Sequence, residues 1–316
     1  MMKAAVVTTA GSEPEYRDFP RPEAGQGGQI VDLVASAIHP VVRAKASGEH
    51  YSSTGEFPLV PGVDAVARTA DGTLVYTGDV ESPWGTFAER MAVTLALPLP
   101  IGADPVAVAA GVNPGMSSWM PLTGHAEEHG TPDTVMILGV TGAAGGLAVQ
   151  NALGLGVRRV IGVGRGADAI KRVAGLGAET VEIVGDQGVD AAAIGAAFDG
   201  KAPDLVLDFL WGGAAEAAFQ ALVDLPGEGS TSYAEIGSAA GEQATVPASL
   251  LRSRPFRLSG SGIGSFDMRR YFAEVAVYVQ RIADGKVQVD AHAYPLSRVG
   301  EAWTAPAGPR PVLIAD

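Results

Sequence analysis

Residues Thr134–Gln150 read TVMILGVTGAAGGLAVQ, an apolar run followed by a glycine-rich turn and a helix-forming run. The apolar residues Val135–Leu138 predict a buried strand, and Leu147–Gln150 favour a helix. A strand, a glycine turn and a helix in this order present the N–H groups of a helix N-terminus to a pyrophosphate. The glycines permit a tight turn, a close approach of the backbone to phosphate, and close packing of helix on strand. We therefore predict dinucleotide contacts from the turn residues Gly139, Thr141, Gly142, Ala143 and Ala144.

The tip of the next strand, Arg158–Val163, predicts which dinucleotide is bound. Folds of this kind that bind NAD carry an acidic residue about 20 positions after the glycines, where it accepts hydrogen bonds from the ribose hydroxyl. This chain has Gly164 and Arg165 there instead. A guanidinium attracts the 2′-phosphate of NADPH and can bind it bidentately. The presence of Arg165 therefore predicts NADPH rather than NADH as the cofactor. Alternatively, Arg165 is a loop residue whose charge is simply solvated. Asp168 is expected beyond the turn, in the first turn of the next helix.

The composition excludes several classes of function. The length of 316 residues suggests two domains of ordinary size or one large one, and 47% hydrophobic with 18% charged residues suffice for a packed core. The formal net charge is −13 without a long basic run, which argues against nucleic acid or an anionic membrane as partner. No apolar stretch reaches the ~18 residues of a membrane span, and no signal-peptide pattern is recognised. The absence of cysteine excludes disulfides and thiolate metal sites. We expect a cytoplasmic protein.

The order of the predicted elements indicates two domains. Residues 1–100 contain short strands, with a hairpin signal at Asp71-Gly72. Two short helices are then expected on either side of Asn113-Pro114-Gly115, followed by alternating strands and helices, which predict a parallel sheet covered on both faces. The tail after Val287 returns to strands that we expect to pair with the N-terminal domain. We predict an α/β fold, with a doubly wound Rossmann domain at 116–265 and an antiparallel β-rich domain at 1–115 and 266–316.

Short motifs occur along almost the whole chain: Pro61-Gly62-Val63-Asp64, Gly115-Met116-Ser117-Ser118-Trp119, Gly139–Gln150, Gly175-Leu176-Gly177-Ala178, Pro295-Leu296-Ser297 and Glu301-Ala302-Trp303. They resemble the P-G-x-[DE], G-x-T-A-[YW], G-x-[ST]-G-x-x-G…A-V-Q, L-G-A and P-L…E-A-W segments of the medium-chain dehydrogenase/reductases. The resemblance is to their zinc-free NADPH:quinone oxidoreductase, or zeta-crystallin-like, branch. It implies a GroES-like fold for the β-rich domain, NADPH as cofactor, and a homodimer formed by the sheet edges of the cofactor domains.

The positions that bind zinc in related enzymes are changed in this chain. Zinc-dependent relatives use a Cys, a Gly-His-Glu turn and a later Cys or Asp, whereas this chain has His39 at the first position and Gly62-Val63-Asp64 at the turn. A single histidine is too few, because zinc takes three or four protein ligands. We therefore expect no metal. Zinc-free relatives carry Asn-Pro-x-Asp near the nicotinamide, where this chain has His39-Pro40-Val41-Val42. His39 then contacts the nicotinamide or substrate, or is a half-buried histidine with satisfied hydrogen bonds.

The resemblance implies hydride transfer from NADPH to a quinone or to the β-carbon of an α,β-unsaturated carbonyl. Negative charge develops on the acceptor oxygen, so a hydrogen-bond donor must face it. The candidate catalytic residues are Tyr51, which lies at or next to the family's G-x-Y tyrosine, and His39. Alternatively, the ring of Tyr51 only lines the pocket. For Ser117, which is predicted to contact the cofactor, the alternative is a hydroxyl at the start of a helix. Further predicted cofactor contacts are Ser117, Gly164, Arg165, Gly237, Ser238, Ser259, Gly260 and Arg310.

Two other functions stay open at the level of sequence. One is an enoyl reductase of a biosynthetic pathway, which differs in the size of its substrate. The other is a protein that binds NADPH without turnover, as a sensor or a crystallin-like structural protein. The second alternative is motivated by the loss of the family's Asn and Asp at His39 and Val42.

Overall fold

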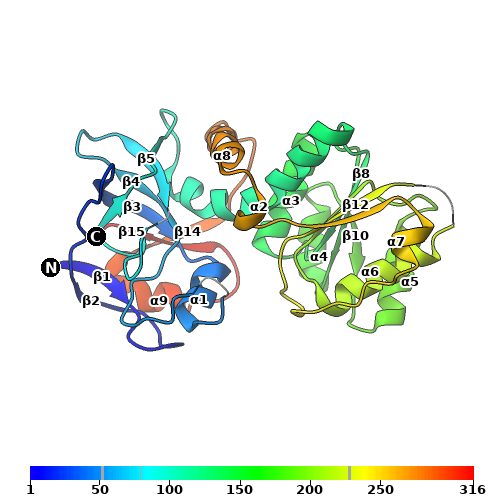
Figure 1. The fold of residues 1–316 in the computed structure, drawn as a ribbon, viewed down its shortest axis with the longest axis horizontal. Helices are drawn as coiled ribbons and strands as arrows, with labels where there is room; N and C mark the ends of the chain where they lie inside the picture. Colours follow the sequence, from blue (N-terminus) through cyan, green and yellow to red (C-terminus); the bar gives the residue numbers. More distant parts are fainter. Residues whose placement is uncertain (51–52, 79, 227–228) are drawn as a thin grey trace. The chain divides into compact units, whose positions relative to one another are not determined.

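The computed structural model describes residues 1–50, 53–78, 80–226 and 229–316 (Figure 1). The chain forms two compact units: a first unit of Met1–Asn113 with Ala276–Asp316, and a second unit of Pro114–Val275. Both boundaries fall inside long helices, α2 (Pro105–His129) and α8 (Met268–Ala283). No helix in the described ranges is both long enough and apolar enough to cross a membrane.

The first unit is built on a largely antiparallel sheet with the strand order β14-β15-β3-β4-β5-β7, in which β6 also pairs with β3. A separate antiparallel pair consists of β1 and β2. The strands are β1 (Met2–Val6), β2 (Glu15–Phe19), β3 (Gln29–Ala37), β4 (Asp64–Arg68), β5 (Leu74–Gly78), β6 (Arg90–Val93), β7 (Leu97–Pro98), β14 (Ala291–Pro295) and β15 (Arg310–Ile314). The helices of this unit besides the long ones are α1 (Pro40–Ser47), the 3₁₀ turn η2 (Leu296–Arg298) and α9 (Val299–Trp303).

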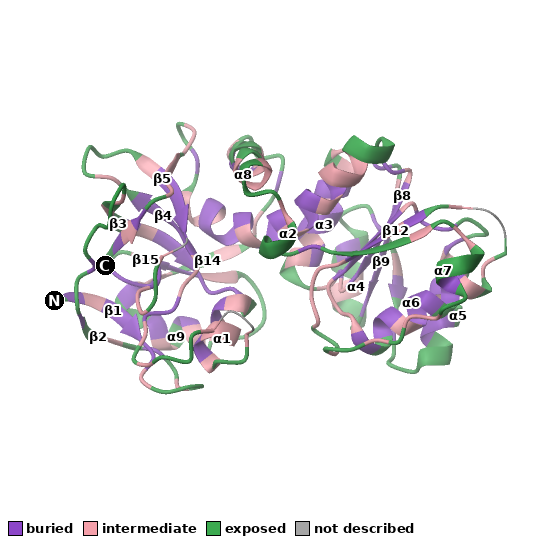
Figure 2. Ribbon diagram, in the orientation of Figure 1, coloured by how far each residue is buried: buried purple, intermediate pink, exposed green. Residues whose placement is uncertain are grey.

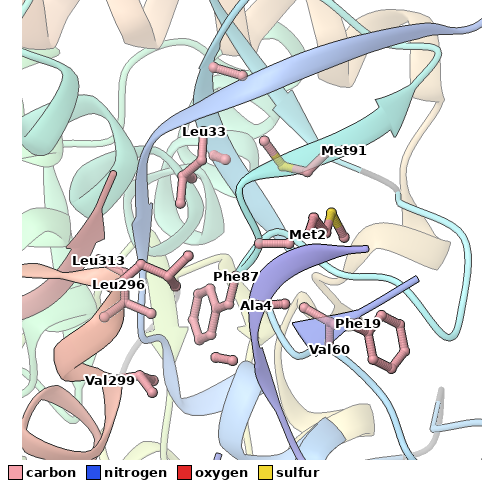
Figure 3. Close-up of a cluster of buried hydrophobic side chains, with 14 of the residues drawn as sticks. Met2, Ala4, Phe19, Leu33, Val60, Phe87, Met91, Leu296, Val299 and Leu313 are labelled. Carbon is pink, nitrogen blue, oxygen red and sulfur yellow. The ribbon is translucent and has the colours of Figure 1, made fainter. Parts of the chain in front are cut away.

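Two predictions for this unit are confirmed. Gly72 adopts φ 92° in the turn that joins β4 to β5, as the Asp-Gly hairpin signal requires. The C-terminal tail pairs with the N-terminal part of the chain, because β15 runs antiparallel to β3 with Val312 opposite Ala37. Side chains from both parts share one core, in which Met2, Phe87 and Leu313 are buried (Figure 3).

The second unit contains a parallel sheet with the strand order β10-β9-β8-β11-β12-β13, which confirms the predicted doubly wound α/β fold. Its strands are β8 (Thr134–Leu138), β9 (Arg159–Gly164), β10 (Glu179–Glu182), β11 (Leu205–Asp208), β12 (Thr231–Glu235) and β13 (Phe256–Gly260). Its shorter helices are α3 (Ala143–Gly154), α4 (Ala167–Ala174), α5 (Gln187–Ala197), α6 (Gly212–Asp224), α7 (Leu250–Ser253) and the 3₁₀ turn η1 (Ile263–Ser265).

Burial explains why the central strands are apolar throughout. All residues of β8 and β11 are buried, because helices cover both faces of the sheet (Figure 2). One apolar cluster joins Met136 and Val206 to α5 and α6, and the other joins Ile137 and Leu207 to α3 and Leu122 of α2. The carboxyl ends of the six strands therefore meet at one edge, supported from both sides.

The prediction of two short helices around Asn113-Pro114-Gly115 is wrong, because α2 continues through Pro114 and Pro121. An interior proline lacks an N–H donor and crowds the preceding turn, at a cost of about 3 kcal/mol. The flanking side chains are almost fully buried, among them Met116 and Leu122. Side-chain hydroxyls also donate hydrogen bonds to backbone carbonyls of this helix, and the Ser118 hydroxyl donates to the carbonyl of Gly115. Burial of the helix thus outweighs the proline penalty.

Candidate active site

The loop between β8 and α3 has the geometry of a phosphate-binding turn. Gly139 adopts φ 89°, and its N–H donates to the carbonyl of Val163 at 2.9 Å. The helix begins at Ala143 after Gly142, which is extended (φ −78°, ψ 164°) and exposed. The first N–H groups of a helix have no acceptor within it. The loop therefore offers solvent-facing donors at the positive end of the helix dipole.

The glycines of this region have different roles. A Cβ on Gly145 would lie 2.4 Å from the carbonyl oxygen of Gly139, so only glycine allows α3 to pack against the turn. A Cβ on Gly164 would lie 2.8 Å from Cγ2 of Thr141. A Cβ on Gly142, in contrast, would meet only the Gly139 oxygen, at 3.6 Å. Gly145 and Gly164 serve packing, whereas Gly142 keeps the space in front of the helix open, and these residues fit a dinucleotide pyrophosphate.

Arg165 follows β9 and is exposed. Its Nη2 atom lies beside Gly185, because a Cβ built there would come within 3.4 Å of it. Among the described residues, no carboxylate forms an ion pair with this guanidinium. Asp168 is in the first turn of α4, as predicted. Arg165 is therefore available to a phosphate at the tip of β9.

The remaining predicted contacts of the second unit follow β12 and β13. The Gly237 N–H donates to the Asp208 carbonyl at 3.2 Å, and Ser238 donates from Oγ to Oε1 of Glu242 at 2.7 Å. Ser259 lies within β13, which ends at Gly260. Parallel strands end at one edge, so these residues share the edge of the glycine turn. The second unit thus brings together predicted contacts from β8, β9, β12 and β13.

A residue that the sequence analysis missed, Asp208, supports this edge at the end of β11. Its Oδ1 accepts hydrogen bonds from the N–H groups of Leu210 (2.8 Å) and Trp211 (3.0 Å), and its Oδ2 accepts one from the hydroxyl of Tyr233 (2.6 Å). Burial raises the pKa of this carboxyl despite the three donors. The turn it holds contacts the glycine loop, since a Cβ on Gly139 would lie 3.1 Å from Leu210. The sequence pattern that could have identified Asp208 is a single acidic residue at the end of an apolar strand.

In the first unit, His39 caps α1 and is only 1% exposed. Its Nε2 lies 3.4 Å from Oδ1 of Asp64, whose Oδ2 accepts a hydrogen bond from the hydroxyl of Tyr76 at 2.7 Å. Within the described part of the chain, neither ring nitrogen of His39 has a hydrogen-bond partner. His39 is therefore fully buried rather than half-buried, with Nε2 facing the carboxylate of Asp64.

The other predicted residues lie in different surroundings. Tyr51 lies outside the described residues. Ser117 is inside α2 rather than at a helix start, and its Oγ donates to the carbonyl of Pro114 at 2.5 Å. Arg310 begins β15 in the first unit, where its Nη1 donates to the carbonyl of Ile38 at 3.2 Å. Over the described ranges, no three His, Asp or Glu side chains are grouped to hold a metal ion.

Comparison with known proteins shows that the chain is similar to quinone oxidoreductases. No family model matches the chain. A probable NADPH-dependent quinone reductase of Emericella nidulans is 28% identical over 348 residues, covering 96% of each chain. A mycobacterial quinone oxidoreductase has a similar structure, with a TM-score of 0.83 and 21% identity over 99% of this chain and 100% of the other. The Thermus thermophilus quinone oxidoreductase, studied also as its NADPH complex, gives a TM-score of 0.80 and 22% identity, over 99% of this chain and 100% of the other. The predicted resemblance to the quinone oxidoreductase branch of the medium-chain dehydrogenase/reductases is therefore confirmed in sequence and in fold.

Proposed function

We propose that this protein is a zinc-independent oxidoreductase that transfers a hydride from NADPH to a quinone or an α,β-unsaturated carbonyl. The observation that carries the proposal is the exposed Gly142 before α3, on the same sheet edge as Arg165, which forms no ion pair with any described residue. The relative from Emericella nidulans is named as a probable NADPH-dependent quinone reductase, which supports the same cofactor and acceptor class.

Each unit has a distinct part in the proposed reaction. The N–H groups at the start of α3 bind the pyrophosphate, and Arg165 binds the 2′-phosphate. NADPH, when bound, supplies the hydride from C4 of its nicotinamide. His39 and Tyr51 donate hydrogen bonds to the acceptor oxygen, on which negative charge develops. Asp64, oriented by Tyr76, faces one ring nitrogen of His39 and leaves the other for this role.

Turnover with purified protein tests this function. We expect tight binding of NADPH, followed by nicotinamide fluorescence, and oxidation of the complex by 1,4-benzoquinone or a simple enone. Tyr51→Phe removes the phenolic donor and should lower kcat about 100- to 1,000-fold, within the range typical of a general acid or an oxyanion donor. Tight NADPH binding without oxidation by either acceptor would contradict the proposal and favour a specialised enoyl substrate or a non-catalytic role.

The preference for NADPH is tested by Arg165→Ala. Because a hydrogen bond to a charged group contributes about 1.5–3 kcal/mol, the Kd for NADPH should rise about 10- to 100-fold. The Kd for NADH, which lacks the 2′-phosphate, should stay unchanged. Arg158→Ala is the matched control, since Arg158 precedes the opposite end of β9 and pairs with Asp133. An equal loss of affinity for both dinucleotides would refute the assignment.

We further propose that the protein forms a homodimer through β13, as the family resemblance implies. β13 is the outer strand of its sheet and four of its five residues are exposed. Leu258 on this strand and Ile263 just beyond it are 37% and 52% exposed, which is unusual for large apolar residues near a sheet edge. Sedimentation equilibrium would measure the mass, and a monomer at all concentrations would contradict the proposal. A cytoplasmic location stays a prediction.

A further inference from the structure

A cavity of about 190 Å³ lies between the second half of α2 and the strands β12 and β13, and all of its lining residues belong to the second unit. One end is at Ser261, just beyond β13, and the other is at Leu205 and Arg257, near the amino ends of β11 and β13. The predicted cofactor contacts Ser259 and Gly260 line its carboxyl end. The cavity therefore runs from the cofactor edge over the face of the sheet, towards residues that the proposed cofactor site does not use.

Three side chains that line this cavity have a buried polar atom without a hydrogen-bond partner among the described residues. They are Oγ of Ser261, Nδ1 of His125 and Nε of Arg270. Ser261 is only 8% exposed. The three residues come from separate segments of the chain, the end of β13, α2 and α8. Buried polar groups without partners cost free energy, so their meeting around one cavity indicates a ligand that carries hydrogen-bonding groups.

The charges of the two arginines that line the cavity are compensated. Arg257 donates from Nη1 to Oε2 of Glu128 at 2.7 Å. The Nη2 atom of Arg270 lies 3.3 Å from Oε2 of Glu127. Burial lowers the pKa of His125, so its ring is neutral at pH 7 and offers one donor and one acceptor. An anionic ligand would face the two glutamates as well as the arginines, and the cavity therefore favours a neutral ligand.

We propose that this cavity is a second binding site, which takes a small neutral aromatic ring with a hydroxyl group, such as a phenol. A cavity of about 150 Å³ holds one benzene molecule, so this one accommodates a ring with a small polar substituent. Phe266 and Met120 offer apolar surface to the ring. Ser261, His125 and Arg270 offer their unpaired polar atoms to the hydroxyl. Hydroquinones, the products of the proposed quinone reduction, belong to this class, and only this link to turnover rests on the proposed function.

Calorimetry with the full-length protein and phenol tests the site, because the proposed reaction neither consumes nor forms phenol. We expect a Kd of about 1 mM or lower for a ligand of this size. Ser261→Ala and His125→Phe each remove one hydrogen-bonding atom and should raise the Kd about 3- to 10-fold. Neither change should lower the melting temperature, because the atoms removed have no partner within the described protein. Ser253→Ala, an exposed serine of α7, is the matched control and should leave the Kd unchanged.

Benzoate, a ring of similar size that carries a negative charge, tests the class of ligand and should bind more weakly than phenol. Tighter binding of benzoate than of phenol would overturn the assignment of a neutral ligand. The site itself would be disproved by a lack of phenol binding at about 10 mM, or by an unchanged Kd in both variants. Failure of the proposed reaction is a separate result, since phenol binding reports on the cavity whether or not NADPH is oxidised.

Discussion

Gly142→Val should abolish NADPH binding, raising the Kd at least about 100-fold, without destabilising the protein. The backbone at Gly142 is extended, a conformation that valine adopts readily, and a Cβ there meets only the Gly139 oxygen at 3.6 Å. The methyl groups would instead occupy the space in front of the first N–H groups of α3, where the pyrophosphate must lie. Fluorescence titration measures the Kd, and urea unfolding measures stability.

Two neighbouring glycines provide controls for this result. Gly146→Val places the same side chain at the fourth residue of α3, where the backbone N–H already donates to the carbonyl of Gly142 and the nearest atom to a Cβ is 4.0 Å away. NADPH affinity should be unchanged in this variant. Gly145→Ala should lose stability, because its Cβ would lie 2.4 Å from a backbone oxygen. If Gly142→Val binds NADPH as tightly as Gly146→Val does, the turn is not the pyrophosphate site.

Asp208→Ala should lower the free energy of unfolding by about 3–4 kcal/mol, a large effect for one residue. The change removes the acceptor of two backbone N–H groups and of the Tyr233 hydroxyl, all at a fully buried position. Buried donors left without partners lose their hydration and gain nothing in exchange. The turn that holds Trp211 at φ 54° would also lose its support. Urea unfolding followed by far-UV circular dichroism would measure the loss.

Asp208→Asn is the matched variant for this experiment. The amide oxygen can still accept from Leu210 and Trp211, and the Tyr233 hydroxyl can turn to accept from the amide nitrogen. Because burial raises the pKa of Asp208, replacing its charge with a neutral amide removes part of a desolvation cost. We therefore expect a loss of about 1 kcal/mol or less. Equal losses in the two variants would show that the charge, rather than the hydrogen-bond geometry, stabilises the turn.

The parts of the fold that sequence predicts correctly depend on local physics. The turn at Gly72 requires a positive φ that glycine adopts freely, so a dipeptide predicts a hairpin. The glycines after β8 and the apolar runs of β8 and β11 predict a parallel sheet with a glycine turn that leads into a helix. In each case, the residues that decide the structure are adjacent in the chain.

The tertiary structure alone decided what depends on contacts between distant residues. Helix α2 continues through two prolines because its flanking side chains become buried, which local propensity does not register. Asp208 accepts a hydrogen bond from Tyr233, which is 25 residues away in the sequence. His39 lies beside Asp64, which follows it by 25 positions. Sequence by itself thus determined the fold class and the glycine turn before α3, and tertiary packing decided which side chains become buried together, because burial and desolvation arise only once the chain has folded.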